Sequence, residues 1–218
     1  MPENQDGKAV EVTERKQVYH HAFLNVVEAH LRYRRANGHM SNEVTRLVVQ
    51  HSDAVGVLAY DPQADVVLLV RQFRYPVYDR LSEKERSGSG VRAAWLLEIV
   101  AGLLEDNQSA EETARRELRE EIGYEATGAL ERIATVYNSP GSLAEQITIF
   151  LAEVDTSARH DRGGGLADEG EDTEIVKLSV DEALAMLARG ELRDTKTVIA
   201  LQHLARRRAV GNSGQARR

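Results

Sequence analysis

The segment from Ser109 to Gly123 limits most strongly how this chain can fold. Ser109 followed by Glu112 is a capping-box signal for the start of a helix, and Gly123 supplies a left-handed stop, so the pattern predicts a helix over Ser109–Ile122. Apolar residues recur along one side of this helix, which must therefore pack against a second layer. That buried stripe consists of Ala110, Ala114 and Leu118.

Short apolar runs rich in β-branched residues supply candidates for that second layer. Ala36-Asn37-Gly38 separates two such runs between Phe23 and Val49, and Asn-Gly favours a hairpin because both residues tolerate positive φ. The remaining predicted strands are Ala54–Tyr60, Val66–Val70, Trp95–Ala101, Leu130–Val136 and Gln146–Val154. These runs predict strands beside the helix, beginning with an N-terminal β-hairpin.

Two polar stretches and two further helices complete the pattern. Leu81–Ala93 is charged and rich in Gly and Ser, so we expect an exposed loop. The acidic, glycine-rich stretch Asp155–Asp172 is longer than an ordinary connector, which favours a functional role. A second capping box at Ser179, with Gly190 as its stop, predicts one closing helix, and Asp194 opens another that runs to about Arg208.

The composition excludes several classes of function. With 35 acidic and 28 basic residues and a formal net charge of -7, the chain shows no broad basic surface for nucleic acid. The absence of cysteine excludes disulfides, thiolate zinc sites and cysteine nucleophiles. No signal peptide and no apolar run of membrane-spanning length is recognisable, so we expect a soluble, cytoplasmic protein with no membrane partner.

The predicted helix carries a cluster of carboxylates. Glu117, Glu120 and Glu121 are spaced i, i+3 and i+4, which crowds their like charges onto one face. For an arbitrary charged helix, the commoner explanation is a solvated face neutralised by the neighbouring Arg115, Arg116 and Arg119. The alternative is that a hard divalent cation offsets the repulsion, because magnesium prefers carboxylate oxygens and substrate phosphates.

The surrounding pattern decides between these alternatives. Gly102, followed at fixed spacing by Arg116-Glu117-Leu118-Arg119-Glu120-Glu121-Ile122-Gly123, resembles the Nudix box. The first glutamate of that box is replaced here by Gln108, and Tyr124 stands where the box has an aliphatic residue. The family's first glutamate usually supports the loop and helix, so we expect weaker support and retained activity, with Glu105 or Asp106 as substitutes for the charge.

The resemblance extends from about Phe23 to Leu204, through segments similar to ADP-ribose pyrophosphatases, GDP-mannose hydrolases and UDP-sugar diphosphatases. These segments are Val70–Arg74, Leu97–Leu104, Ser139-Pro140-Gly141 with Glu145, and Gly163–Asp172. The resemblance implies an α/β fold, the Nudix α/β/α sandwich with a mixed sheet. It also implies an N-terminal β subdomain at residues 1–50, a catalytic domain at 51–210 and a loose tail at 211–218. It also implies a homodimer in which the N-terminal region helps to form the partner's pocket.

The resemblance also implies roles for individual residues. The carbonyl of Ala101 and the carboxylates of Glu117 and Glu121 would bind Mg²⁺, for which Mn²⁺ is a substitute, with Glu120 close by or sharing a metal. Clustered metals would neutralise the diphosphate and lower the pKa of an attacking water. Glu169 would act as the base, or as a ligand that orients the water.

Four further residues are candidates for contacts with substrate. Arg46 and Arg74 match positions that grip substrate in similar enzymes, although an arginine at a strand end is more often a surface salt-bridge partner. Glu98 is either a contact to substrate or metal-bound water, or a structural hydrogen-bond acceptor. Glu145 suits a contact to substrate or metal-bound water.

The expected reaction is hydrolysis of a nucleoside diphosphate sugar, foremost of ADP-ribose to AMP and ribose 5-phosphate. GDP-mannose and UDP-glucose are alternative substrates. Two rival hypotheses remain: a Nudix hydrolase of another diphosphate, and a non-catalytic sensor of nucleotide sugars. The Gly-rich acidic loop disfavours the first, and the retained Glu117, Glu120, Glu121 and Glu169 disfavour the second.

Overall fold

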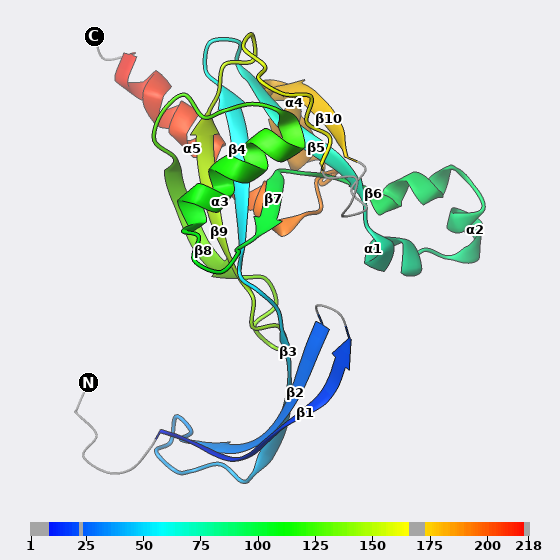
Figure 1. The fold of residues 1–218 in the computed structure, drawn as a ribbon, viewed down its shortest axis with the longest axis vertical. Coiled ribbons are helices and arrows are strands. Elements are labelled where there is room, and N and C mark those ends of the chain that lie inside the picture. The colour runs from blue at the N-terminus through cyan, green and yellow to red at the C-terminus, as the bar shows by residue number, and fades with distance from the viewer. Residues whose placement is uncertain (1–8, 22–23, 166–172, 216–218) are drawn as a thin grey trace. The chain divides into compact units, whose positions relative to one another are not determined.

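The computed structural model describes residues 9–21, 24–165 and 173–215, with side chains as far as residue 210. The chain divides into two compact units (Figure 1). One comprises the described residues of Met1–Ser52 and Tyr137–Gln146, and the other those of Asp53–Val136 and Ile147–Arg218.

The second unit is built on a mixed sheet of seven strands. Its order is β10-β5-β4-β9-β8, with β6 paired to β5 and β7 paired to β4. The β4–β9 pair is parallel, whereas β5 and β7 run antiparallel to β4. The strands are β4 (Ala54–Asp61), β5 (Val66–Phe73), β6 (Trp95–Glu98), β7 (Val100–Leu103), β8 (Glu131–Tyr137), β9 (Gln146–Glu153) and β10 (Glu174–Ser179).

Helices cover both faces of this sheet, because its central strands are apolar on both sides. On β4, Val55 and Val57 face a core formed with α3 (Ala110–Glu117) and the π-helix η2 (Leu118–Ile122). Leu58 of the same strand faces a second core, formed with α4 (Val180–Ala188) and α5 (Thr195–Gln215). Figure 1 shows α3 crossing in front of β4, with α5 behind the sheet. The predicted α/β/α sandwich is confirmed.

The predicted strand Trp95–Ala101 is instead two strands, divided at Ile99. β4 and β5 pair only over Ala59–Asp61 and Val66–Leu68, so they diverge beyond that point. The segment fills the resulting gap: β6 pairs with β5 and β7 pairs with β4. The chain therefore changes its pairing partner just before Ala101 and Gly102.

The stretch predicted as the exposed loop Leu81–Ala93 is largely exposed but partly helical. After α1 (Tyr75–Asp79), α2 (Glu83–Arg86) begins with a capping box, and the 3-10 helix η1 (Ser89–Ala94) leads into β6. The Ser82 amide donates to the Glu85 carboxylate at 2.8 Å. This is the same Ser-x-x-Glu signal that predicts α3, but without the apolar stripe of a longer helix it does not distinguish a short helix from a loop.

The first unit contains an antiparallel sheet in the order β1-β2-β3. β2 (Leu24–Tyr33) and β3 (Val44–Gln50) are the predicted hairpin, and Gly38 between them has φ of 85°. β1 (Val10–His21) was not predicted, because two register irregularities interrupt its alternation of side chains. Phe23 lies outside the described residues.

The closing helices begin where the sequence places them. The Ser179 hydroxyl accepts a hydrogen bond from the Glu182 amide, and Gly190 after α4 has φ of 72°. α5 continues to Gln215 instead of ending near Arg208, so residues 211–215, which the sequence assigns to a loose tail, are helical. Among the described residues, none of the helices is both long and apolar enough to cross a membrane.

Candidate functional site

The helix that carries the glutamate cluster is fixed at both ends. Ser109 and Glu112 make the reciprocal capping box, and Gly123 closes the helix with φ of 75°. The last turn winds as the π-helix η2, a form that recurs at functional sites because it changes the direction of side chains within a helix. Glu117 and Glu121 are buried, with 8% and 3% of their surface exposed.

Gly102 brings Glu117 against strand β7. A β-carbon at position 102 would lie 1.9 Å from Oε1 of Glu117 and 2.0 Å from its Cδ, far inside van der Waals contact. Only glycine therefore allows the carboxylate to approach the backbone here. The same contact places Glu117 next to the peptide unit that joins Ala101 to Gly102.

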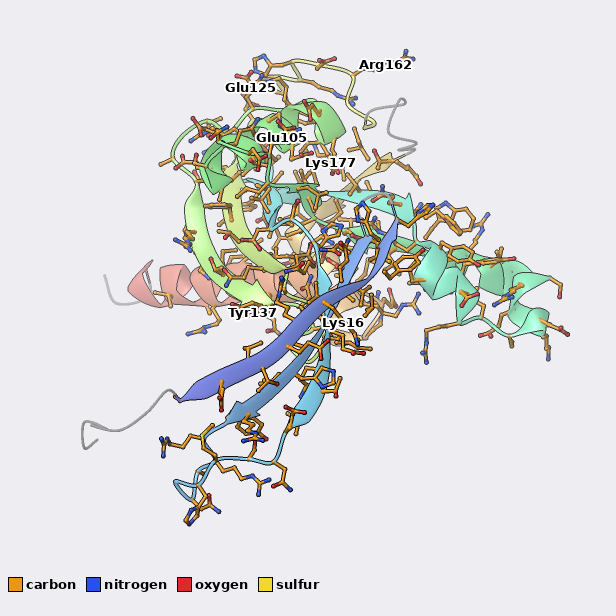
Figure 2. The ribbon with its side chains drawn as sticks, turned by 60° about the horizontal axis from the view of Figure 1, so that its bottom comes forward. Lys16, Glu105, Glu125, Tyr137, Arg162 and Lys177 are labelled. Atoms are coloured by element: carbon orange, nitrogen blue, oxygen red, sulfur yellow. The ribbon has the colours of Figure 1, made fainter. Side chains whose placement is uncertain are left out.

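Arg116 neutralises part of the cluster. Its guanidinium lies 2.8 Å from a Glu117 oxygen, 2.6 Å from Glu120 and 3.4 Å from Glu105, which Figure 2 labels beside α3. Burial alone would lower the pKa of Arg116, but the charges of Glu117 and Glu120 outweigh it and raise that pKa. Arg115 instead forms an ion pair with Glu111 at 3.0 Å, and Arg119 forms one with Glu125 at 3.2 Å.

The donors at this position are chemically suited to a hard divalent cation, which prefers carboxylate and carbonyl oxygens. In the described part of the chain, however, no three acidic or histidine side chains form a group that could hold a metal ion. Arg116 already contacts Glu117 and Glu120. A cation bound by Glu117 would therefore compete with Arg116 for the same oxygens.

The loop after β9 is docked on the end of η2. The amide of Gly164 donates to the carbonyl of Glu121 at 2.7 Å, and the amides of His160 and Asp161 donate to the carbonyl of Gly123. A β-carbon at Gly163 would lie 2.8 Å from the same Glu121 carbonyl. These contacts show that Gly163 and Gly164 allow the loop to approach the backbone of η2 closely. Glu169 lies outside the described residues.

Arg74 and Glu98 form a bonded pair, which is the ion-pair alternative for Arg74 and the structural-acceptor alternative for Glu98. Nε and Nη2 of Arg74 donate to the two carboxylate oxygens of Glu98 at 2.7 and 2.8 Å. The bond to Glu98 is the main cause that raises the pKa of Arg74, with smaller contributions from the charges of Asp194 and Glu121. Arg74 is therefore close enough to Glu121 to feel its charge.

Glu98 is buried, with 2% of its surface exposed, yet it stays acidic. Burial would raise its pKa, but hydrogen bonds from Arg74 and the charge of Lys196 outweigh burial and lower that pKa. Lys196 is not among the site residues that the sequence predicts. A lysine next to the helix start at Asp194, followed by apolar residues, is the one signal that could have indicated it.

Arg46 and Glu145 both belong to the first unit. Arg46 is exposed on β3 and bonds to the carbonyl of Thr45 at 2.9 Å. Glu145 is half-buried, 3.8 Å from His51 and 3.4 Å from Asn138. Their predicted contacts with substrate stay predictions.

A cavity of about 670 Å³ lies elsewhere in the second unit. Among its lining residues are Arg71, Trp95, Leu97 and Arg193. Leu97 packs against the core on the α4 and α5 side, whereas Glu117 and Glu121 come from α3 and η2 on the other face. Of the predicted site residues that the structure describes, none lines this cavity.

Comparison with known proteins adds a family and relatives. Residues 50–201 match the model of the NUDIX domain. The chain is 37% identical over 194 residues to a GDP-mannose pyrophosphatase of Pectobacterium atrosepticum, covering 89% of this chain and 93% of that protein. It is 35% identical over 195 residues to an ADP-ribose pyrophosphatase of Escherichia coli, covering 89% and 87%. A crystal structure of an ADP compounds hydrolase shares the fold, with a TM-score of 0.69, 18% identity, and coverage of 96% and 98%.

Proposed function

This chain belongs to the Nudix family, and from that premise we propose that it is a magnesium-dependent hydrolase of the diphosphate in nucleoside diphosphate sugars. The observation that carries the proposal is the approach of the Glu117 carboxylate to Gly102, beside the buried Glu121. A plain solvated helix face would leave these acids in water. Instead, both carboxylates are buried, and Gly102 leaves room for one of them against strand β7.

The proposed reaction adds water across the diphosphate. The water oxygen attacks one phosphorus atom, the bond from that atom to the bridging oxygen breaks, and the bridging oxygen leaves with the other phosphate. A bound divalent cation supplies neutralisation of the diphosphate charge and a lower pKa for the attacking water. Ala101 through its carbonyl, with Glu117 and Glu121, would hold it, and Glu120 would lie near.

Other residues are proposed to bind substrate and accept a proton. Arg74 retains donor hydrogens on Nη1, so it can grip a phosphate or base while its Nε and Nη2 stay bonded to Glu98. Glu169 is proposed as the base that accepts the proton of the water. The comparison of Glu169→Gln with Glu145→Gln, at saturating substrate and magnesium, tests this role, which is wrong if only Glu145→Gln lowers kcat.

ADP-ribose is the proposed substrate, with AMP and ribose 5-phosphate as products. GDP-mannose, which would give GMP and mannose 1-phosphate, is the second candidate, because the relatives carry both activities in their names. A panel of ADP-ribose, GDP-mannose and UDP-glucose with Mg²⁺, analysed by product chromatography, distinguishes them. Binding of a nucleotide sugar without any product would overturn catalysis and favour a sensor.

A homodimer is the proposed assembly. The three-stranded sheet exposes large apolar side chains, among them Val12 at 56% and Leu47 at 52%. Exposed apolar surface of this kind is typical of an interaction face. Sedimentation analysis tests the assembly, and a fully active monomer would contradict it.

A further inference from the structure

Lys196 lies almost entirely out of solvent in the second unit. It is 8% exposed, and its Nζ lies 2.5 Å from Oε2 of Glu98 and 2.9 Å from Oδ1 of Asp194. A buried ammonium is costly unless it is paired and hydrogen-bonded, and here both carboxylates lie within hydrogen-bonding distance of it. With Arg74, these groups form a set of two acids and two cations, in which Glu98 and Lys196 are buried and Arg74 and Asp194 are partly exposed.

The start of α5 holds this set in place. Oδ2 of Asp194 accepts hydrogen bonds from the amide of Thr197 at 3.0 Å and from its hydroxyl at 2.5 Å. Oγ1 of Thr197 in turn accepts from the amide of Ile99 at 2.8 Å. Ile99 lies between β6 and β7, outside both ladders, so this bond supplies the partner that its amide would otherwise lack.

The side chain of Lys196 connects the two faces of the sheet. A β-carbon at Gly56 would lie 3.5 Å from Cδ of Lys196, so the lysine stem runs along β4 on the side of α5. Glu98 is opposite Val70 in the ladder, and Val70 belongs to the core on the α3 side. Directly opposed residues share a face. Lys196 therefore joins α5 to a carboxylate on the face that carries Glu117 and Glu121.

We propose that Lys196 is a positioning residue for Arg74. Glu98 receives three charged hydrogen bonds, two from Arg74 and one from Lys196. Without Lys196, Arg74 would be the one described side chain that bonds to the carboxylate, although the carboxylate is there to orient Arg74. The inference rests on the proposed function, because it assigns to Arg74 the gripping of substrate.

Loss of the Lys196–Glu98 contact should therefore affect KM and kcat differently. Arg74 grips the substrate in the ground state and in the transition state alike, so loss of its orientation raises KM more than it lowers kcat. A lysine with a merely structural role would lower stability and leave KM unchanged when the protein is folded.

The test uses Lys196→Met, which keeps the length of the side chain and removes its charge, in the wild-type chain and in an Arg74→Ala background. We expect Lys196→Met to raise KM about 10-fold with kcat within about 3-fold. In the Arg74→Ala background, the same change should add less than about 2-fold, because both substitutions remove one interaction. Full additivity, or an unchanged KM, overturns the proposal.

Asp194→Asn provides a second variant if Lys196→Met folds poorly. Asparagine still caps a helix, so α5 stays capped while Lys196 loses a charged partner. KM should rise in the same direction by a smaller factor, and an unchanged KM overturns the proposal. Lys177→Met, at an exposed lysine on β10 labelled in Figure 2, is the matched control and should leave KM at the wild-type value.

Calorimetric titration with ADP-ribose, in the absence of added metal, keeps the two proposals distinguishable. If wild type hydrolyses no member of the panel, the proposed function fails, and weaker binding by Lys196→Met still supports the positioning role. If Arg74→Ala binds and turns over as wild type does, the positioning role fails while hydrolysis stands.

Discussion

The two sheets of this protein obtain their stability in different ways. On β4, in the seven-stranded sheet, every residue but Tyr60 is buried, and both faces pack against helices. On β1, in the three-stranded sheet, all twelve residues are exposed, although the strand pairs along its length with β2. A sheet of this size needs a hydrophobic face for independent stability, and on β1, β2 and β3 Val27 is the one buried residue. A binding partner that covers exposed side chains would therefore stabilise the first unit more than the second.

The polar contacts of the two units also differ in burial. Lys16 of β1 pairs with Glu28 of β2 at 2.8 Å (Figure 2), but surface ion pairs contribute little to stability. In the second unit, by contrast, Asp61 bonds to Thr156 from a buried position. The chemistry proposed for the second unit and the assembly proposed for the first can be tested separately.

The largest effect is expected in the second unit. Glu117→Gln or Glu121→Gln should lower kcat by at least about 100-fold, because metal ligands contribute several kcal/mol to the transition state. The fold should persist, since each change removes a repelling charge from the helix. Steady-state kinetics at saturating Mg²⁺, with circular dichroism as the control, measure both. Turnover near the wild-type rate in either variant would show the ligand assignment to be wrong.

The next effect concerns the acid stability of the second unit. Burial would raise the pKa of Asp61, but hydrogen bonds from Gln63, Ala64 and Thr156 outweigh it and hold the pKa at about 2, below its usual 3.8. Because the folded pKa is depressed, the stabilisation is complete above about pH 4 and is lost as pH falls to about 2. It amounts to about 2 kcal/mol.

Asp61→Asn should remove this part of the pH dependence. Urea unfolding followed by the fluorescence of Trp95, the single tryptophan, reports on the second unit alone. An acid profile in the variant identical to that of wild type would contradict the assignment. Far-ultraviolet circular dichroism of the same samples adds the first unit and shows whether the two unfold together.

A smaller effect is expected from the first unit. Arg46→Ala should raise KM about 10-fold and change kcat less, because it removes binding shared by the ground and transition states. Arg35→Ala, at an exposed arginine in the turn of the same sheet, is the control. Kinetics combined with sedimentation test the idea that Arg46 reaches the pocket of a partner, and an active monomer would refute it.

The smallest effect concerns Gln108. Its side chain accepts from the Thr113 hydroxyl at 3.1 Å and donates to Glu105 at 2.8 Å, and Glu105 is itself near Arg116. Gln108→Glu should leave kcat equal or improved, within about 2-fold, because the family usually has a carboxylate at this position. Inactive wild type that is rescued by the substitution would favour the sensor hypothesis.

The sequence predicts best where local signals and the tertiary structure agree. Capping chemistry, which acts over a few residues, predicts both the start of α3 after Ser109 and the end of η2 at Gly123. The division of the strand at Ile99 could not be read in this way, since it depends on where β4 and β5 diverge. β1 was missed because its irregular register hides the alternation.

The site shows the same limit. The spacing of the box predicts Glu117 and Glu121 as metal ligands, because two residues four positions apart in one helix lie on the same face. The pairing of Arg74 with Glu98 joins positions 24 residues apart, and that of Glu98 with Lys196 joins positions 98 apart. Only the folded sheet brings those side chains together, and no local pattern encodes them.

The contact between Gly102 and Glu117 has a consequence for how the protein can vary. The residue at 102 limits where the side chain of Glu117, fifteen residues later, can lie. A single methyl group at 102 would occupy the place of the carboxylate. In a mutational library, alanine at 102 would reproduce the phenotype of a lost glutamate while every acidic residue is still present. Substitutions at 102 and at 117 are therefore not independent. Gly102 should tolerate as few replacements as the acidic residues of the box.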